Sequence, residues 1–125
     1  MKVFRALLGA GLLAGALSLP AEAAIVSIRS CYDGDTCRTT TGERIRLACI
    51  DTPEVGQAGA SSATYATRRL VQGKTVGIRR ITTDRYGRTI AELYAPDGTN
   101  VGEQLVAEGK ARIYRRYAYQ CPWAR

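Results

Sequence analysis

The 125-residue sequence predicts an α+β fold in which five antiparallel strands close into a small OB-type barrel, accompanied by two helices. Three observations support this prediction. Short segments in which apolar and polar residues alternate, as in half-buried strands, recur between glycine-containing turns. Two longer segments have helical apolar spacing instead. The order of three strands, a helix, two strands and a second helix is one that an OB-type barrel accommodates.

The first 23 residues have the layout of a secretory signal peptide. Two positive charges precede an apolar run of 14 residues, and a small-x-small sequence ends at Ala23. Such a run is too short to span a bilayer comfortably, which argues against an uncleaved anchor. We therefore predict cleavage after Ala23 or Ala24, export to the periplasm or the medium, and one domain over residues 24–125 without membrane attachment.

The first half of this domain is expected to contain three strands, at residues 25–30, 36–41 and 44–50. Asp33 and Gly34, between the first two strands, form a strong hairpin-turn signal. In the third strand Ile45, Leu47 and Cys49 alternate with other residues, so they are expected on one face.

The second half is expected to contain helices at 58–72 and 100–109 and strands at 74–80, 88–94 and 111–114. Gly73 stands where a helix-terminating glycine belongs. Asn100 followed by Glu103 has the form of a capping box, with Asn in the place of Ser or Thr, and Gly109 closes this second helix.

Removal of the leader leaves 16 basic and 10 acidic residues, a net charge of +6. This charge favours a polyanionic partner, although solubility alone is an alternative explanation. The sequence contains no histidine. Mechanisms that need a histidine base or a histidine metal ligand are therefore excluded, and any hydrolysis must use carboxylates, arginines, hydroxyls or a metal ion.

Four cysteines in an exported chain favour two disulfides, for which three pairings are possible. Cys31 and Cys37 flank the first hairpin turn, so a local bridge between them is expected. Cys49 and Cys121 are then left as the long-range pair. A zinc site is disfavoured because the chain has neither a C-x-x-C spacing nor a histidine.

Carboxylates occur at two turns: Asp35 follows the first strand, and Asp51 and Glu54 follow the third. Taken singly, such residues are most often part of a turn or a solvated loop. A meander places the first hairpin beside the end of the third strand, so the three side chains are expected to converge in a hard-oxygen site that suits Ca²⁺. Arg46 and Arg88, on two strands, carry guanidinium groups that match phosphate oxygens.

Three motifs follow one another in the chain: Asp-Gly-Asp-Thr at 33–36, Arg46 five residues before Asp-Thr-Pro-Glu at 51–54, and Thr-Asp-Arg-Tyr-Gly-Arg at 83–88. Their order and internal spacing resemble those of staphylococcal nuclease and its thermonuclease-like relatives. The resemblance covers roughly residues 25–114, which is nearly all of the mature chain.

This resemblance implies a Ca²⁺-dependent phosphodiesterase that cuts DNA and RNA, single-stranded or locally melted, between phosphorus and the 5′ oxygen to leave 3′-phosphate ends. We expect it to act as a monomer. The implied roles are Ca²⁺ binding by the carboxylates of Asp35 and Asp51 and the carbonyl of Thr52, action on the attacking water by Glu54, binding of the reacting phosphate by Arg46 and Arg88, and contact with the terminal phosphate by Arg85 and Tyr86.

The chain departs from the family after the last strand. The family places base-stacking tyrosines there, and this chain offers Tyr114, Tyr117 and Tyr119 in a different register. The family also continues into a C-terminal helix that we expect this domain to lack, which would leave apolar surface exposed and the domain marginally stable. Two other functions remain open: a non-catalytic OB-fold module for single-stranded nucleic acid, and a structural or inhibitory secreted protein.

Overall fold

The computed structural model describes residues 23–125. The predicted signal peptide, residues 1–23, lies outside the described residues except for its last position. Within residues 23–125, no helix combines the length and the apolar character needed to cross a bilayer.

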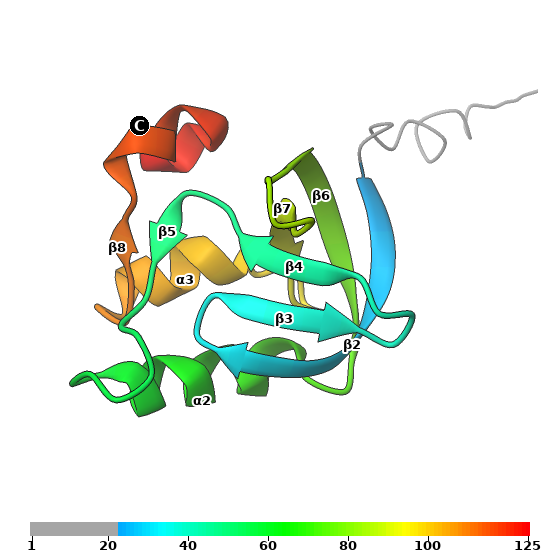
Figure 1. The fold of residues 1–125 in the computed structure, drawn as a ribbon, viewed down its shortest axis with the longest axis horizontal. Helices are drawn as coiled ribbons and strands as arrows, with labels where there is room; N and C mark the ends of the chain where they lie inside the picture. Colours follow the sequence, from blue (N-terminus) through cyan, green and yellow to red (C-terminus); the bar gives the residue numbers. More distant parts are fainter. Residues whose placement is uncertain (1–22) are drawn as a thin grey trace, which may run out of the picture.

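Five strands close into a barrel, so the predicted α+β barrel fold is confirmed (Figure 1). The strands lie in the order β2–β3–β4–β7–β6. Their bounds are β2 Ala23–Asp33, β3 Thr36–Thr39, β4 Arg44–Leu47, β6 Thr75–Thr83 and β7 Thr89–Tyr94. Neighbours pair antiparallel except β4 and β7, which run parallel, with Arg46 beside Ile90. The expectation of a fully antiparallel barrel is therefore wrong for the pair formed by β4 and β7.

The predicted third strand, 44–50, is in fact two short strands. β4 ends at Leu47, and the chain turns at Cys49, which has a φ of 71° in the left-handed region. β5, Ile50–Asp51, then leaves the barrel and pairs with β8, Arg112–Ile113. Ile45 and Leu47 are buried as predicted, but Cys49 belongs to a second apolar cluster rather than to their face.

The two predicted helices are present. α2, Ala60–Val71, begins two residues later than expected, directly after Gly59, whose φ is 86°. α3, Val101–Ala107, begins where the Asn100 side chain accepts a hydrogen bond from the Glu103 backbone N–H at 3.1 Å, which confirms the predicted N-terminal cap. α2 lies beneath the end of β2, and α3 lies between β8 and β4 in this view (Figure 1).

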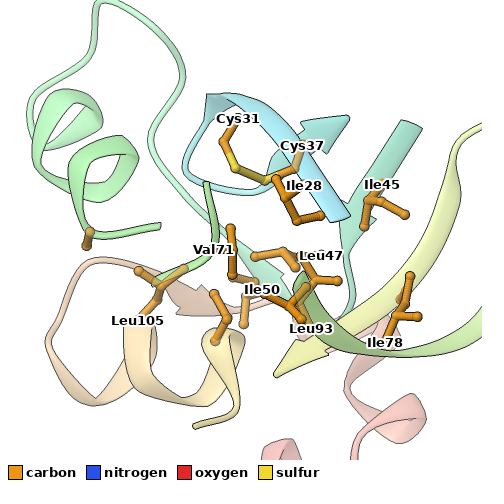
Figure 2. Packing of buried hydrophobic residues seen from close by; sticks show 14 residues of the cluster. Ile28, Cys31, Cys37, Ile45, Leu47, Ile50, Val71, Ile78, Leu93 and Leu105 are labelled. Atoms are coloured by element: carbon orange, nitrogen blue, oxygen red, sulfur yellow. A yellow bond between two sulfur atoms is a disulfide. The ribbon is translucent and has the colours of Figure 1, made fainter. Parts of the chain in front are cut away.

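The main core fills the barrel with aliphatic side chains from the strands and both helices (Figure 2). Ile28, Leu47 and Leu93 meet there with Val71 and Leu105 from α2 and α3. Burial of each such side chain stabilises the fold by about 1.5–3 kcal/mol. Since residues 23–125 contain no Phe, these aliphatic contacts carry most of the packing.

Both predicted disulfides are present. Cys31 and Cys37 join β2 to β3 and belong to the main core (Figure 2). Cys49 and Cys121 join the turn after β4 to the chain's last residues.

The residues after β8 form a packed tail rather than an extended end. The tail consists of two short 3₁₀ segments, Arg115–Gln120 and Pro122–Ala124, joined at Cys121. Its residues Ala118, Cys121 and Ala124 are buried against Ala48 and Cys49. The sequence predicted exposed apolar surface in the absence of the C-terminal helix, whereas this tail covers the apolar surface around Ala48 and Cys49. Sequence periodicity gave no sign of this packing, because the tail uses a disulfide and small side chains rather than an amphipathic helix.

A buried carboxylate, Glu92 on β7, holds this tail in place. Its Oε1 accepts hydrogen bonds from the Trp123 indole N–H at 2.7 Å and the Asn100 amide at 2.9 Å. Its Oε2 accepts two from the Arg79 guanidinium, at 2.9 and 2.6 Å. Burial raises the pKa of Glu92, but the hydrogen bonds from Trp123, Asn100 and Arg79 outweigh it, so the net pKa lies below the ordinary value.

Replacement of Glu92 by glutamine should therefore destabilise the domain in a pH-dependent way. Because the folded pKa lies below the ordinary value of 4.5, the contribution of Glu92 is complete above that pH and is lost as the pH falls through the folded pKa. We expect E92Q to lower the free energy of unfolding at pH 7 by about 2–3 kcal/mol. Urea unfolding between about pH 7 and pH 3 checks this. The exposed-site variant E103Q is the control, and a deficit in E92Q that is equal at both pH values would contradict the assignment.

Candidate active site

Arg46, on β4, lies at the centre of the predicted site. Its Nη2 is 3.3 Å from Asp35 Oδ2 and 3.4 Å from Asp51 Oδ1. Its Nη1 donates to the carbonyl oxygens of Leu47 at 2.6 Å and Ile50 at 2.9 Å. The turn after β4 thus folds back around the guanidinium. These contacts fix the position of Arg46, and the two predicted metal ligands, Asp35 and Asp51, both contact its guanidinium group.

Asp35 is almost completely buried, which makes its charge costly without a cation. Burial raises the pKa of its carboxyl group, and the Arg46 charge and the Thr52 backbone N–H, which donates to Asp35 Oδ2 at 3.0 Å, offset this only in part. The neighbouring Gly34 allows the turn between β2 and β3 to approach Thr52 and Ala63 closely. A Cβ at Gly34 would lie 2.9 Å from both Ala63 and the Thr52 side chain, so glycine is required there.

The segment after β5 carries the remaining predicted groups, Thr52 and Glu54. Thr52 is buried, and within residues 23–125 its Oγ1 has no hydrogen-bond partner. Glu54 is exposed, and no hydrogen bond or ion pair engages its side chain in the described part of the chain. Residues 23–125 contain no group of three Asp, Glu, His or Cys side chains that could hold a metal ion. The predicted convergence of Glu54 with Asp35 and Asp51 is therefore wrong for this structure. Two of the three acids meet, and they meet at an arginine.

The turn between β6 and β7 presents Arg85, Tyr86 and Arg88. Asp84 organises this turn: its Oδ1 accepts from the backbone N–H groups of Tyr86 and Arg88, both at 2.9 Å, and its Oδ2 accepts from Arg88 Nε at 2.8 Å. Arg44 donates to the Tyr86 carbonyl from below. The Arg85 and Arg88 guanidinium groups lie 5.1 and 5.7 Å from the centre of the exposed Tyr86 ring.

Two clefts meet at the contact between Arg46 and Asp51. The first, here called the arginine cleft, has a volume of about 630 Å³, and its lining includes Arg46, Arg85, Tyr86, Arg88, Tyr114, Arg116 and Tyr117. The second, the acid cleft, has a volume of about 680 Å³, and its lining includes Asp51, Thr52, Glu54, Lys110 and Arg112. The arginine cleft thus gathers four of the eight predicted site residues, and the acid cleft gathers three others.

The tail supplies one wall of the arginine cleft. Tyr114 and Tyr117 line it, with ring centroids 5.0 Å apart in an edge-to-face arrangement. Tyr119 is not part of the lining and is 66% exposed. Of the three tyrosines that the sequence left open, the first two are therefore placed to contact a ligand in the cleft.

Three cations at the site, Lys110, Arg112 and Arg116, were not predicted. Arg112 Nη2 lies 3.1 Å from Asp51 Oδ2, on the opposite side of that carboxylate from Arg46. The pairing of β5 with β8 creates this contact by placing Asp51 beside Arg112. Because the left-handed turn at Cys49 has no clear sequence signal, the pairing was not foreseeable from residue pattern.

Fold and site together define a small OB-type barrel domain with a cleft lined by arginines and tyrosines beside paired carboxylates. Residues 44–122 match the family described as "Staphylococcal nuclease homologue". The chain belongs to this family, which confirms the resemblance found in the sequence.

Relatives with related names extend this comparison. An "Uncharacterized endonuclease" of Escherichia coli O157:H7 is 42% identical over 88 residues, which cover 68% of this chain and 58% of the relative. A "Micrococcal nuclease" of Shigella flexneri is 38% identical over 96 residues, covering 68% and 55%. An "Uncharacterized endonuclease" of Haemophilus influenzae is 36% identical over 91 residues, covering 70% and 51%. The chain thus spans slightly more than half the length of these relatives.

The disulfide between Cys49 and Cys121 should be needed for a stable tail and cleft wall. The two cysteines are 72 residues apart, and closing a loop of that length stabilises by about 4 kcal/mol in the chain-entropy model. We expect the C49S/C121S variant to lose about that much unfolding free energy in urea. The C31S/C37S variant, with a separation of only six residues, should lose less. Equal stability of C49S/C121S and the parent chain would contradict this assignment.

Proposed function

We propose that this chain is a Ca²⁺-dependent nuclease that hydrolyses phosphodiester bonds of DNA and RNA and leaves 3′-phosphate ends. The observation that carries the proposal is the position of Arg46, which contacts Asp35 and Asp51 while it also lines the cleft that contains Arg88. Acidic oxygen ligands and phosphate-binding guanidinium groups thus share one location. The family membership and the names of the relatives agree with nucleic-acid hydrolysis.

The donor groups at this location suit calcium. Asp35, Asp51 and the carbonyl of Thr52 offer hard oxygen atoms, which Ca²⁺ prefers. Burial raises the pKa of Asp35, so a cation bound beside this carboxylate would stabilise its charged form. Thr52 Oγ1, which has no hydrogen-bond partner within residues 23–125, offers a further oxygen. Arg46 already contacts both carboxylates, so a bound ion would share them with it. Calcium held there would add positive charge beside the phosphate oxygens.

Arg46 and Arg88 would bind and stabilise the reacting phosphate. Each guanidinium is fixed by its own partners, Arg46 by two carbonyls and two carboxylates and Arg88 by Asp84, so little reorganisation is needed when charge develops on phosphorus. Both line the arginine cleft, so two fixed cations would be available to one phosphate group bound there.

Glu54 would act on the attacking water from the acid cleft. It is exposed and unpaired within the described residues, so its carboxylate is free to orient a water molecule or accept its proton. The cleavage would break the bond between phosphorus and the 5′ oxygen, with the water oxygen joining phosphorus and the 5′ oxygen leaving with a proton.

The cleft walls favour a substrate with unpaired bases. Tyr114 and Tyr117 offer ring faces and edges on one wall, and Arg85 and Tyr86 lie on the opposite turn, where they would contact a terminal phosphate. Bases stack on aromatic side chains only when they are splayed out, so single-stranded or locally melted DNA and RNA fit better than a closed duplex.

Cleavage in the presence of different metals tests the metal assignment. We expect a single-stranded oligonucleotide to be cut with Ca²⁺, to be cut little with Mg²⁺, and to remain intact with chelator. Mg²⁺ requires a tight octahedral shell, which a site on two loops and a carbonyl supplies less readily. Equal or higher rates with Mg²⁺ alone would contradict the proposal.

The second candidate is a non-catalytic module that binds single-stranded nucleic acid in the same cleft. One observation favours it: residues 23–125 contain no group of three acidic side chains that could hold a metal ion. The two candidates differ in a simple result, since the module binds the oligonucleotide tightly but leaves it uncut at saturating Ca²⁺. The exported, monomeric state that the sequence predicts belongs to either candidate.

A further inference from the structure

A second basic surface lies on α2, and none of its residues lines either cleft. The sequence has no acidic residue between Glu54 and Asp84, a stretch that includes all of α2. On this helix Tyr65, Arg68 and Arg69 are spaced at i, i+3 and i+4, which places them on one face, and all three are exposed. The opposite face of α2 is buried in the core through Ala63, Ala66 and Val71.

Contacts between α2 and β2 place a second exposed tyrosine, Tyr32, one residue after the backbone group that Arg68 binds. Arg68 Nε donates to the Cys31 carbonyl at 3.0 Å, and the Gln72 side chain accepts from the Cys31 N–H at 2.9 Å. Tyr32 is the residue that follows Cys31, and its side chain is 71% exposed. Figure 1 shows the end of β2 lying along α2. Tyr32, Tyr65, Arg68 and Arg69 together are called the tyrosine–arginine face below.

The chemistry of this face is that of a surface for single-stranded nucleic acid. Tyr65 is 67% exposed, and the Arg69 guanidinium lies 6.0 Å from its ring centre. Among the ion pairs of residues 23–125, none involves Arg68 or Arg69, so their charges are open to an external anion. Exposed aromatic rings interleaved with unpaired arginines stack bases and bind the phosphate backbone at once.

We infer that the tyrosine–arginine face is an accessory site that holds single-stranded DNA or RNA outside the arginine cleft. The inference rests on the proposed function only for the identity of the polymer. None of the four residues lines either cleft. A domain of this size has a radius of gyration of about 13 Å, and stacked nucleotides are about 3.4 Å apart, so a strand of about ten nucleotides is long enough to reach both sites. A short substrate then contacts the cleft alone, whereas a long one gains from both sites.

Binding of oligonucleotides of two lengths, measured by fluorescence anisotropy in chelator, tests this inference. The variant Y32A/Y65A/R69Q removes the face but keeps Arg68, which bonds to Cys31. The matched control Y119A/R38Q removes an exposed tyrosine of the tail and an exposed arginine whose guanidinium reaches the turn after β3. For a single strand of about 30 nucleotides we expect the face variant to bind about 10- to 100-fold more weakly than the parent chain. The slope of log K against log salt should fall by about one, because one phosphate contact is lost.

For a strand of about four nucleotides, too short to span the two sites, the face variant should bind like the parent chain and like the control. An unchanged affinity for the long strand would overturn the inference. An equal loss for both lengths would also overturn it, since the effect would then come from the cleft or the fold. Selective loss of binding to anionic lipid vesicles, with the long strand unaffected, would overturn it in favour of a membrane surface. Cleavage of the short strand with Ca²⁺ reports separately on the proposed nuclease function.

Discussion

Replacement of Glu54 by glutamine is expected to lower the turnover number by about 10²–10⁴, the usual range for the loss of a positioned acid–base group. The substitution preserves size and polarity but removes the base. Glu54 is exposed and makes no ion pair in the described chain, so the fold and the contacts of Arg46 should be unaffected. Binding of a nucleotide 3′,5′-bisphosphate, measured by calorimetry, should remain close to that of the parent chain.

A calcium titration distinguishes Glu54 from the metal-binding acids. Asp35→Ala removes charge from the proposed metal shell, so the rate of D35A should recover in part at high Ca²⁺. The rate of E54Q should not recover, because its defect does not lie in metal occupancy. The exposed acid Glu103 provides a control, and E103Q should retain full activity. Near-normal turnover of E54Q, or a defect that added Ca²⁺ repairs, would show that the proposed role of Glu54 is wrong.

Replacement of Arg46 by alanine is expected to lower turnover by about 10² or more, through loss of charge stabilisation at phosphorus. It should also destabilise the fold. The side chains of Arg46 and Asp35 are 14% and 7% exposed, so removing the arginine leaves a buried carboxylate without its cation. Breaking such a buried pair typically costs about 3–5 kcal/mol. Urea unfolding and initial rates, measured on the same preparation, give the two effects separately.

Arg88→Ala is the matched comparison for Arg46→Ala. It should lose a similar factor in turnover but much less stability, since Asp84 is partly exposed and keeps two backbone N–H donors, from Tyr86 and residue 88. Arg46→Lys keeps the charge but cannot reproduce the guanidinium fork, so its stability should recover more than its rate. Equal activity of R46A and the parent chain would exclude Arg46 from the reaction.

The sequence was sufficient for the barrel because its local signals agree with the fold. The Asp33 and Gly34 turn, the helix stop at Gly73 and the Asn100 cap each formed as predicted. The disulfide pairing also followed from one local argument about Cys31 and Cys37. Where the hydrophobic pattern and the turn residues favour the same local structure, tertiary contacts rarely change that structure.

The parts that the sequence did not reveal depend on contacts between distant segments. The alternation of apolar residues through Cys49 predicts one continuous strand. The left-handed turn at Cys49 instead ends β4, and β5 pairs with β8. The tail is fixed by Glu92, whose carboxylate accepts from Trp123, 31 residues away. Nothing local to Glu92 distinguishes it from a surface acid on a strand.

The candidate site shows the same division. The predicted meander indicated that Asp35 and Asp51 come together, and they do so at Arg46, a contact that the sequence did not predict. It also included Glu54, which lines the acid cleft with Asp51 but forms no three-acid group with Asp35 and Asp51 within residues 23–125. Loop direction depends on packing across the molecule, which residue pattern does not encode.

Analysis of the ends produced from a labelled single-stranded oligonucleotide tests the central claim most directly. The purified chain, incubated with Ca²⁺, should yield fragments with 3′-phosphate and 5′-hydroxyl ends, as identified by mass spectrometry. The same incubation with chelator, or with E54Q, should yield almost none. Tight binding of the oligonucleotide without cleavage at saturating Ca²⁺ would contradict the claim of catalysis, and 5′-phosphate ends would contradict the proposed cleavage of the bond to the 5′ oxygen.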